Sequence, residues 1–87
     1  MCRGSMPSAY ILINCELGCE NALIDELKTL PGVVEACQIY GSTFDIIVKV
    51  CADTEDRLKE VVNRRIRRME KVKATQTMMV VIELHDG

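Results

Sequence analysis

The chain has 87 residues, of which 48% are hydrophobic and 3% are aromatic, and its net charge is -2. This charge gives no general attraction to nucleic-acid phosphates, which argues against direct DNA binding. No apolar run approaches the roughly 18 residues of a membrane helix, and the N-terminus lacks a signal-peptide pattern, so we expect a cytoplasmic protein without membrane contact. A chain this short forms one domain with a small core, since it buries only roughly 60 to 65% of its unfolded surface.

The first predicted elements are a strand and a helix. Residues 1–7 are interpreted as an N-terminal extension or a vector remnant, because a second methionine, Met6, stands just before the first strand-like run. Residues 8–15 are rich in β-forming side chains and predict a strand. Within residues 19–30, leucines recur at helical spacing before a Pro-Gly pair, which predicts an amphipathic helix that ends there.

The rest of the chain adds a hairpin, a second helix and a last strand. Residues 33–40 and 44–51 are two strand-like runs with a short polar turn between them, which predicts the hairpin. Asp53 or Thr54 is a suitable N-cap, and apolar residues at helical spacing follow it. Residues 74–82 are again rich in β-forming side chains and predict the fourth strand.

The order βαββαβ over a single domain at residues 8–84 predicts an α+β fold of the ferredoxin-like kind. Its four-stranded antiparallel sheet would carry both helices on one face. However, apolar side chains occupy both faces of the first strand, as at Ile11 and Leu12, and of the last, as at Met78 and Met79. We therefore expect a homodimer that packs through the other sheet face, with higher oligomers through strand edges or helix rims.

The hairpin turn carries the most suggestive set of polar groups. Gly41 lets the backbone approach a ligand, Ser42 and Thr43 offer hydroxyls, and turn amides can face an anion. Asp45 follows directly and can face a cation. These groups suit a free amino acid, which carries one charge of each sign. The alternative interpretation is an ordinary hairpin connection in which Asp45 only caps the turn.

Three segments resemble a known family. They are Leu30-Pro31-Gly32-Val33, the hairpin from Tyr40-Gly41 to Asp45-Ile46-Ile47-Val48-Lys49-Val50, and Thr75-Gln76-Thr77. With the element order over about residues 8–83, they make the chain similar to the ligand-binding domain of the Lrp/AsnC regulators. The family usually has Gly-x-aromatic-Asp at the turn, whereas Gly41-Ser42-Thr43-Phe44-Asp45 has one extra residue, which alters the local loop.

The resemblance implies a dimer, often assembled into a ring of dimers, with an amino-acid effector between neighbouring dimers and a role in transcription regulation. It implies no cofactor. Family regulators carry an N-terminal helix-turn-helix, but only about seven residues precede the first strand here. We therefore expect a stand-alone effector domain that acts through assembly, by itself or with full-length relatives.

The resemblance also implies roles for single residues. Backbone donors from Gly41 to Thr43, including Ser42, would meet the effector carboxylate, and Asp45 would meet its ammonium group. The remaining pocket residues would be Tyr40, Thr75, Gln76 and Thr77. Thr75 and Thr77 could instead be ordinary β-branched strand residues.

The cysteines suggest an alternative function. The five cysteines have irregular spacing, which favours buried free thiols over a disulfide framework. Cys15 and Cys19 lie four residues apart and could contribute to copper or zinc handling, or to thiol chemistry. No second pair or nearby histidine completes a ligand set, because His85 lies in the tail. A third alternative is an oligomerisation module without an effector.

A dense basic cluster, Arg64-Arg65-Ile66-Arg67-Arg68, is expected to form a solvated helix face near a helix C-terminus. The lesser alternatives are contact with an acidic protein or a weak phosphate contact. We find no Ser-His-Asp set, no glycine-rich phosphate loop and no carboxylate pair at a meaningful spacing, so we do not expect an enzyme or any catalytic residue.

Overall fold

The computed structural model describes residues 7–41 and 43–81. Its elements follow the predicted βαββαβ order, and the second helix continues from an α-helical into a π-helical segment. Within the described residues, no helix is long and apolar enough to cross a membrane. The elements are β1 (Ser8–Cys15), α1 (Glu20–Leu27), β2 (Val33–Gln38), β3 (Ile46–Cys51), α2 (Glu55–Glu60), the π-helix η1 (Val61–Ile66) and β4 (Val72–Met79).

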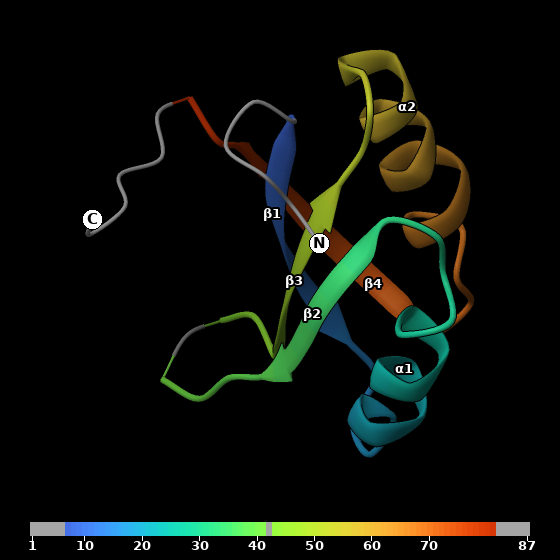
Figure 1. Cartoon of the computed structure of the whole chain (residues 1–87). Helices are drawn as coiled ribbons and strands as arrows, with labels where there is room; N and C mark the ends of the chain where they lie inside the picture. The colour runs from blue at the N-terminus through green and yellow to red at the C-terminus, as the bar shows by residue number, and fades with distance from the viewer. Residues whose placement is uncertain (1–6, 42, 82–87) are drawn as a thin grey trace.

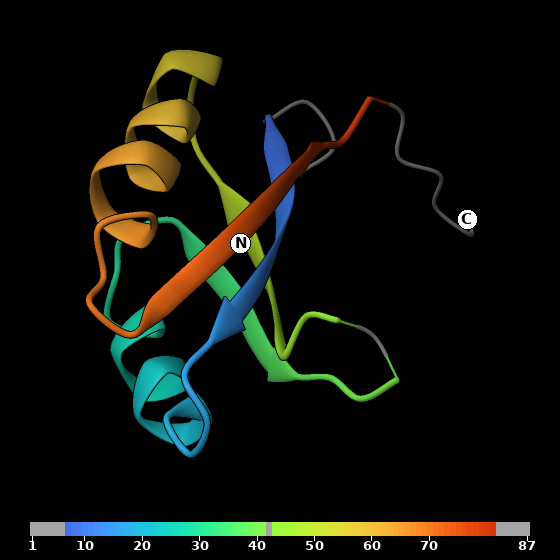
Figure 2. The same cartoon turned by 180° about the vertical axis from the view of Figure 1, so that it is seen from behind.

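The four strands form one antiparallel sheet in the order β2-β3-β1-β4. The two central strands, β1 and β3, are thus the first strand and the second arm of the hairpin. Both helices lie on the same side of the sheet, while the β2–β3 turn projects away from them (Figure 1, Figure 2). This arrangement confirms the predicted ferredoxin-like fold.

Several predicted boundaries were wrong by a few residues. The hairpin strands are shorter than 33–40 and 44–51: β2 ends at Gln38 and β3 begins at Ile46, because residues 39–45 form the turn that the bond from Ile39 N to the Asp45 carbonyl closes. Strand β4 begins at Val72 and not at residue 74, because Val72 already pairs with Cys15. Helix α1 ends at Leu27 and not at residue 30, because the amides of Thr29 and Leu30 bond to carbonyls three residues back, which tightens the last turn. Strand β4 ends at Met79, since its pairing partner β1 begins at Ser8 and only one further bond, from Val80 N to Ser8 O, extends the ladder. The predicted last strand residue, 82, lies outside the described residues.

The core fills the space between the sheet and the helices. Alternate residues of β1 and β3 point into it, and Leu58 and Ile66 of the second helix close it from the other side. Fully burying each of these side chains stabilises the fold by about 1.5–3 kcal/mol. The largest fully buried side chains are Ile11, Ile13, Leu23, Leu27, Ile46, Val48, Val50, Leu58 and Ile66.

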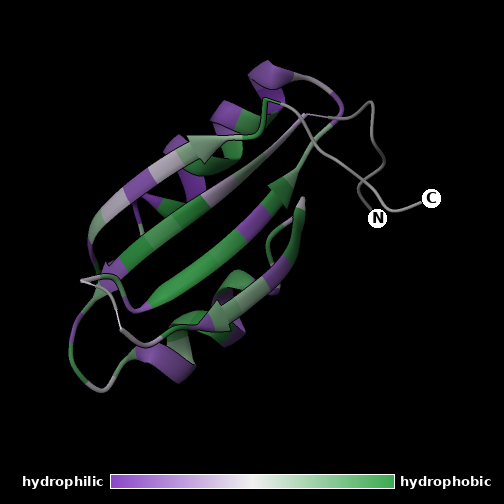
Figure 3. Cartoon of the chain, turned by 90° about the vertical axis from the view of Figure 1, so that its left-hand side faces the viewer, coloured by the Kyte–Doolittle hydropathy of each residue, from purple (hydrophilic) through white to green (hydrophobic). Residues whose placement is uncertain are grey.

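The opposite face of the sheet carries apolar side chains beside polar ones, and no element of the chain that the structure describes covers it. Figure 3 shows the hydrophobic central strands in front of the helices. Leu12 pairs with Ile47 on one side and Gln76 on the other, so these three side chains share this open face. Tyr10 also lies there, with Lys49 Nζ 5.4 Å from its ring centroid. The expected homodimer through this face stays a prediction.

The turn between α1 and β2 packs closely against the end of β3. Gly32 has φ +91°, and a Cβ atom there would lie 2.8 Å from the Cys51 carbonyl oxygen, so only glycine fits. The Cys51 amide donates a hydrogen bond of 2.8 Å to the Gly32 carbonyl. Farther along, the Thr54 hydroxyl accepts a bond from Arg57 N at 3.2 Å, which makes Thr54 the N-cap of α2.

Candidate functional site

The β2–β3 turn is anchored at its base and open at its tip. Ile39 N donates to the Asp45 carbonyl at 2.8 Å, which closes the hairpin, and Asp45 N donates to the Ile13 carbonyl on β1 at the same distance. Gly41 adopts φ +100° with no atom within 4 Å of an added Cβ. The turn therefore needs glycine for its backbone conformation and leaves space beside it.

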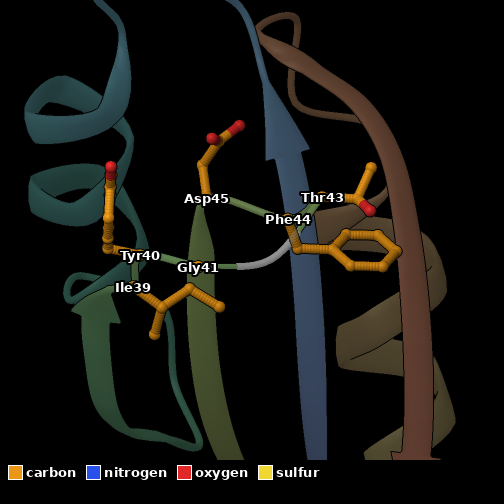
Figure 4. Close-up of a pocket in the computed structure, with 6 residues that line it drawn as sticks. All are labelled: Ile39, Tyr40, Gly41, Thr43, Phe44 and Asp45. Atoms are coloured by element: carbon orange, nitrogen blue, oxygen red, sulfur yellow. The ribbon is translucent and has the colours of Figure 1, made fainter.

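A cavity of about 600 Å³ lies at this turn. Tyr40, Gly41 and Thr43 are exposed, whereas the other lining residues are half-buried. One chain thus supplies one wall of a site and leaves the opposite side open to solvent or to a partner. The cavity is lined by Ile39, Tyr40, Gly41, Thr43, Phe44 and Asp45 (Figure 4).

Asp45 is held in place by β1. Its Oδ2 atom accepts a hydrogen bond from Cys15 N at 3.2 Å and lies 3.9 Å from the Cys15 Sγ donor. In Figure 4 the Asp45 and Tyr40 side chains extend in the same direction. Oδ2 of the carboxylate is therefore held by Cys15 of the central strand β1.

Burial and the contact with Asp45 both affect the pKa of the Cys15 thiol. Burial raises the pKa of this thiol above 9.0, and the negative charge of Asp45 raises the pKa further. Cys15 consequently stays protonated at neutral pH and can act as a donor toward the Asp45 carboxylate. A protonated thiol is a poor nucleophile, which argues against thiol chemistry at Cys15.

The structure brings only some of the expected site residues together. Tyr40, Gly41, Thr43 and Asp45 line one cavity, and Ser42 lies outside the described residues. Two further lining residues were not expected, Ile39 and Phe44, although their positions beside the turn residues could have indicated them.

The expected residues of β4 lie elsewhere. Gln76 pairs with Leu12 and lies on the open face, whereas Thr75 and Thr77 pair with core-facing residues of β1 and lie on the helical side. None of the three lines the hairpin cavity of its own chain, because β1 and β3 separate β4 from the turn strand β2.

The cysteines only partly match their expected state. Cys15, Cys19 and Cys37 are free, but Cys37 is exposed and Cys51 is disulfide-bonded, so the expectation of free buried thiols was wrong for these two. Cys37 is exposed because it pairs with Ile47 and so lies on the open face of the edge strand β2. Over residues 7–41 and 43–81, no three His, Cys, Asp or Glu side chains come close enough to hold a metal ion.

Comparisons with known proteins place this fold in a family. Residues 8–87 match the family model described as the Lrp/AsnC ligand binding domain. No curated protein sequence matches the chain. Among solved structures, the hypothetical protein PHS023 from Pyrococcus horikoshii is 36% identical with a TM-score of 0.82, and the match covers 90% of this chain and 93% of that one.

Two regulators share the fold at lower identity. AsnC of Escherichia coli is 22% identical with a TM-score of 0.85, and the match covers 97% of this chain and 56% of that protein. The transcriptional regulator NMB0573 of Neisseria meningitidis, solved as an L-Met complex, is 13% identical with a TM-score of 0.80, and the match covers 95% and 54%. The family match over nearly the whole chain shows that this chain belongs to the Lrp/AsnC ligand binding domain family, and the fold agrees with it.

Proposed function

We propose that this domain binds a free amino acid at the β2–β3 turn and couples that binding to the assembly of a transcription regulator. The observation that carries the proposal is the hairpin cavity, in which glycine-turn backbone and a fixed carboxylate lie side by side. An amino acid carries an anionic and a cationic group on one carbon, so a site that recognises it needs both partners at short range.

The two ends of the effector would be recognised by different chemistry. The Asp45 carboxylate would accept hydrogen bonds from the ammonium group, and charge-assisted bonds of this type are about twice as strong as neutral ones. Backbone amides from Gly41 to Thr43 would donate to the carboxylate. The contact from Cys15 N keeps Asp45 in place before the ligand arrives, which lowers the ordering cost of binding.

A second copy of the chain would complete the site. The open sheet face carries large apolar side chains such as Leu12 and Ile47, and packing two such faces together would remove them from water. Thr75, Gln76 and Thr77 do not reach the hairpin cavity of their own chain, so any contribution from them would come from a neighbouring copy. An effector bound between two copies would change how the copies assemble. Full-length regulators of the family would be further partners in this assembly.

The relatives support this proposal. The Neisseria meningitidis regulator with the same fold was solved with L-methionine, which is a free amino acid. The 36% identity to the Pyrococcus protein extends over nearly its whole length, so a domain of this size with this sequence pattern occurs there as well.

A thermal-shift screen against the free amino acids tests the proposal. We expect at least one amino acid to raise the melting temperature, because a ligand that binds only the folded state stabilises it. Asp45→Asn keeps an acceptor for Cys15 N but removes the charge, so it should abolish most of the shift. The matched control is Asp53→Asn, an exposed acid outside the hairpin cavity, which should keep the full shift.

Two outcomes would contradict the proposal. An equal shift in Asp45→Asn and the native chain would mean that the carboxylate does not meet the ligand. No shift with any amino acid, in a chain that still forms dimers, would favour an oligomerisation module without an effector. Divalent and monovalent metals on the same plate test the thiol alternative, whose signal would have to disappear in a Cys15 and Cys19 double substitution.

A further inference from the structure

A second cavity, of about 230 Å³, lies in the helix layer, on the other side of the sheet from its open face. Three arginines converge on it from one continuous helical segment, and one acid accompanies them. The side opposite this segment is formed by the turn between α1 and β2. The cavity is lined by Pro31, Arg57, Glu60, Val61, Arg64 and Arg65.

The convergence follows from the helix geometry. Arg57 lies in α2, and Arg64 and Arg65 lie in η1, which follows α2 without a break. A π-helix closes hydrogen bonds to i+5 and appears mainly as a short insertion in an α-helix, frequently at a functional site. Here the amide of Arg67 bonds to the Val62 carbonyl, five residues back, as such a segment requires.

The opposite side of the cavity is rigid. Pro31 has a fixed φ, and the carbonyl of Gly32 next to it accepts the 2.8 Å hydrogen bond from the Cys51 amide. Val61 Cγ2 lies 3.9 Å from the position that a Cβ of Gly32 would take, so the helix packs directly on this turn. A neighbouring cavity of about 250 Å³ shares Pro31, Arg57 and Val61, which extends the groove toward the end of β3.

The positive charge in this groove is only partly compensated. Arg57, Arg64 and Arg65 are exposed, and within residues 7–41 and 43–81 their guanidinium groups have no hydrogen-bond or ion-pair partner, whereas Arg67 donates to Asn63 Oδ1 at 3.3 Å. Glu60 in the first cavity and Asp53 in the neighbouring one offset two of the three positive charges, so the groove keeps a net positive charge. A concave site with one dominant sign of charge concentrates small ions of the opposite sign, even on a chain with net charge -2.

We propose that this groove binds the phosphate chain of a small polyphosphate ligand. Planar guanidinium groups match phosphate oxygens in a bidentate manner, and several of them suit a ligand with more than one phosphoryl group. The compact cavity and the lack of aromatic lining residues disfavour a nucleic-acid strand, which binds through an extended basic groove with base stacking. The site lies in the helix layer, so it stays accessible when a second copy covers the open sheet face.

Calorimetric titration of the whole chain with inorganic tripolyphosphate tests this site. We expect saturable binding at one ligand per chain. Arg64→Gln and Arg65→Gln should each weaken it by about fivefold, the upper range for an exposed charge pair. Arg68→Gln is the matched control, since Arg68 is exposed in the turn just after η1 but does not line the cavity, and it should change the affinity by less than about twofold.

A variant that binds more tightly distinguishes specific binding in this cavity from nonspecific electrostatic binding and from effects of misfolding. Glu60→Gln removes the one acid among the described residues that line the 230 Å³ cavity and should strengthen tripolyphosphate binding by about twofold. Circular dichroism of each variant checks that the fold is intact. Adenosine triphosphate is the second titrant: equal affinity identifies the phosphate chain as the ligand group, and tighter binding identifies a nucleotide as its source.

Three results would overturn the proposal. The first is no saturable binding of either titrant by the native chain. The second is an equal loss of affinity in Arg68→Gln and Arg64→Gln, which would show only a diffuse attraction to the basic helix. The third is binding of duplex DNA without any binding of tripolyphosphate. None of these results bears on the hairpin site, because the two sites share no residue.

Discussion

The two faces of the sheet are built from the same strands but meet different surroundings. In β1, Ile11 points into the helix layer and is fully buried, while its neighbour Leu12 points to the open face and is only partly buried. Both are large aliphatic residues. The difference teaches that one face of this domain is stabilised within the chain. The other face carries large apolar side chains such as Leu12 and Ile47 beside Lys49 and Gln76, without described elements that cover them.

The two glycine turns differ in the same way. Gly32, on the helix-covered side, is in contact with the backbone of β3, whereas Gly41, at the hairpin tip, has open space around it. The covered half of the molecule is fixed by packing. The open half carries the candidate effector site and the apolar face that a partner would cover.

The largest expected effect comes from truncating the two neighbouring residues of β1. Ile11→Ala should lower the free energy of unfolding by about 2–5 kcal/mol, because it leaves a cavity in a filled core. This loss should not depend on protein concentration. Leu12→Ala should instead show a loss that grows with protein concentration in the range where the chain assembles, since assembly adds to apparent stability by mass action. Urea unfolding at several concentrations measures both.

If Leu12→Ala lowered the free energy of unfolding equally at all protein concentrations, the open face would not be an interface between copies. A concentration-dependent loss in Ile11→Ala alone would reverse the assignment of the two faces.

Replacing Gly32 or Gly41 with alanine should have a smaller effect on the free energy of unfolding. Gly32→Ala should lose about 1–3 kcal/mol of stability, because it combines an unfavourable φ with a steric clash against the Cys51 carbonyl. Gly41→Ala has the unfavourable φ alone and should lose only about 1 kcal/mol. Chemical denaturation of the two variants compares them directly. Equal losses would mean that the close approach at Gly32 contributes nothing.

The smallest expected effect is on the pH dependence of stability, at the junction of the two halves. The pKa of Cys15 is higher in the folded chain than its ordinary 9.0, so the folded state holds this proton more tightly. The resulting stabilisation is complete below pH 9.0 and is lost as the pH rises toward the raised folded pKa. Removing the thiol in Cys15→Ala should make the decline above pH 9.0 shallower by less than about 1.4 kcal/mol per pH unit.

The comparison should be made with Cys37→Ala, which removes an exposed thiol. An identical pH slope in Cys15→Ala and Cys37→Ala would contradict the contribution of the buried thiol and its contact with Asp45.

The sequence was sufficient for the fold because local patterns and the packing requirement agree. Leucine spacing in residues 19–30 and the alternation in residues 8–15 each predict the element that forms. The π-helical segment was not predicted, since no residue between Val61 and Ile66 marks it in a one-dimensional pattern. The tightened end of α1 was missed for the same reason, because Leu30 continues the helical spacing past the last helical turn.

The candidate site was less accessible to sequence reasoning. The turn residues follow one another in the chain, so their proximity was predictable. The contact between Asp45 and Cys15, which are 30 positions apart, depends on the pairing of β1 with β3 and has no local signal. The three arginines of the helix-layer cavity were expected to form a solvated face, because the sequence does not show that the Pro31 turn packs beside them.

The mass of the chain in solution tests the account most directly, because both the covering of the open face and the completion of the hairpin site need a second copy. Size-exclusion chromatography with light scattering at micromolar concentration should give twice the chain mass of 9.8 kDa, or a higher multiple. Ile47→Asp, which places a charge on the open face, should shift the mass to that of one chain while the circular dichroism stays unchanged. A monomer mass for the native chain would contradict the account.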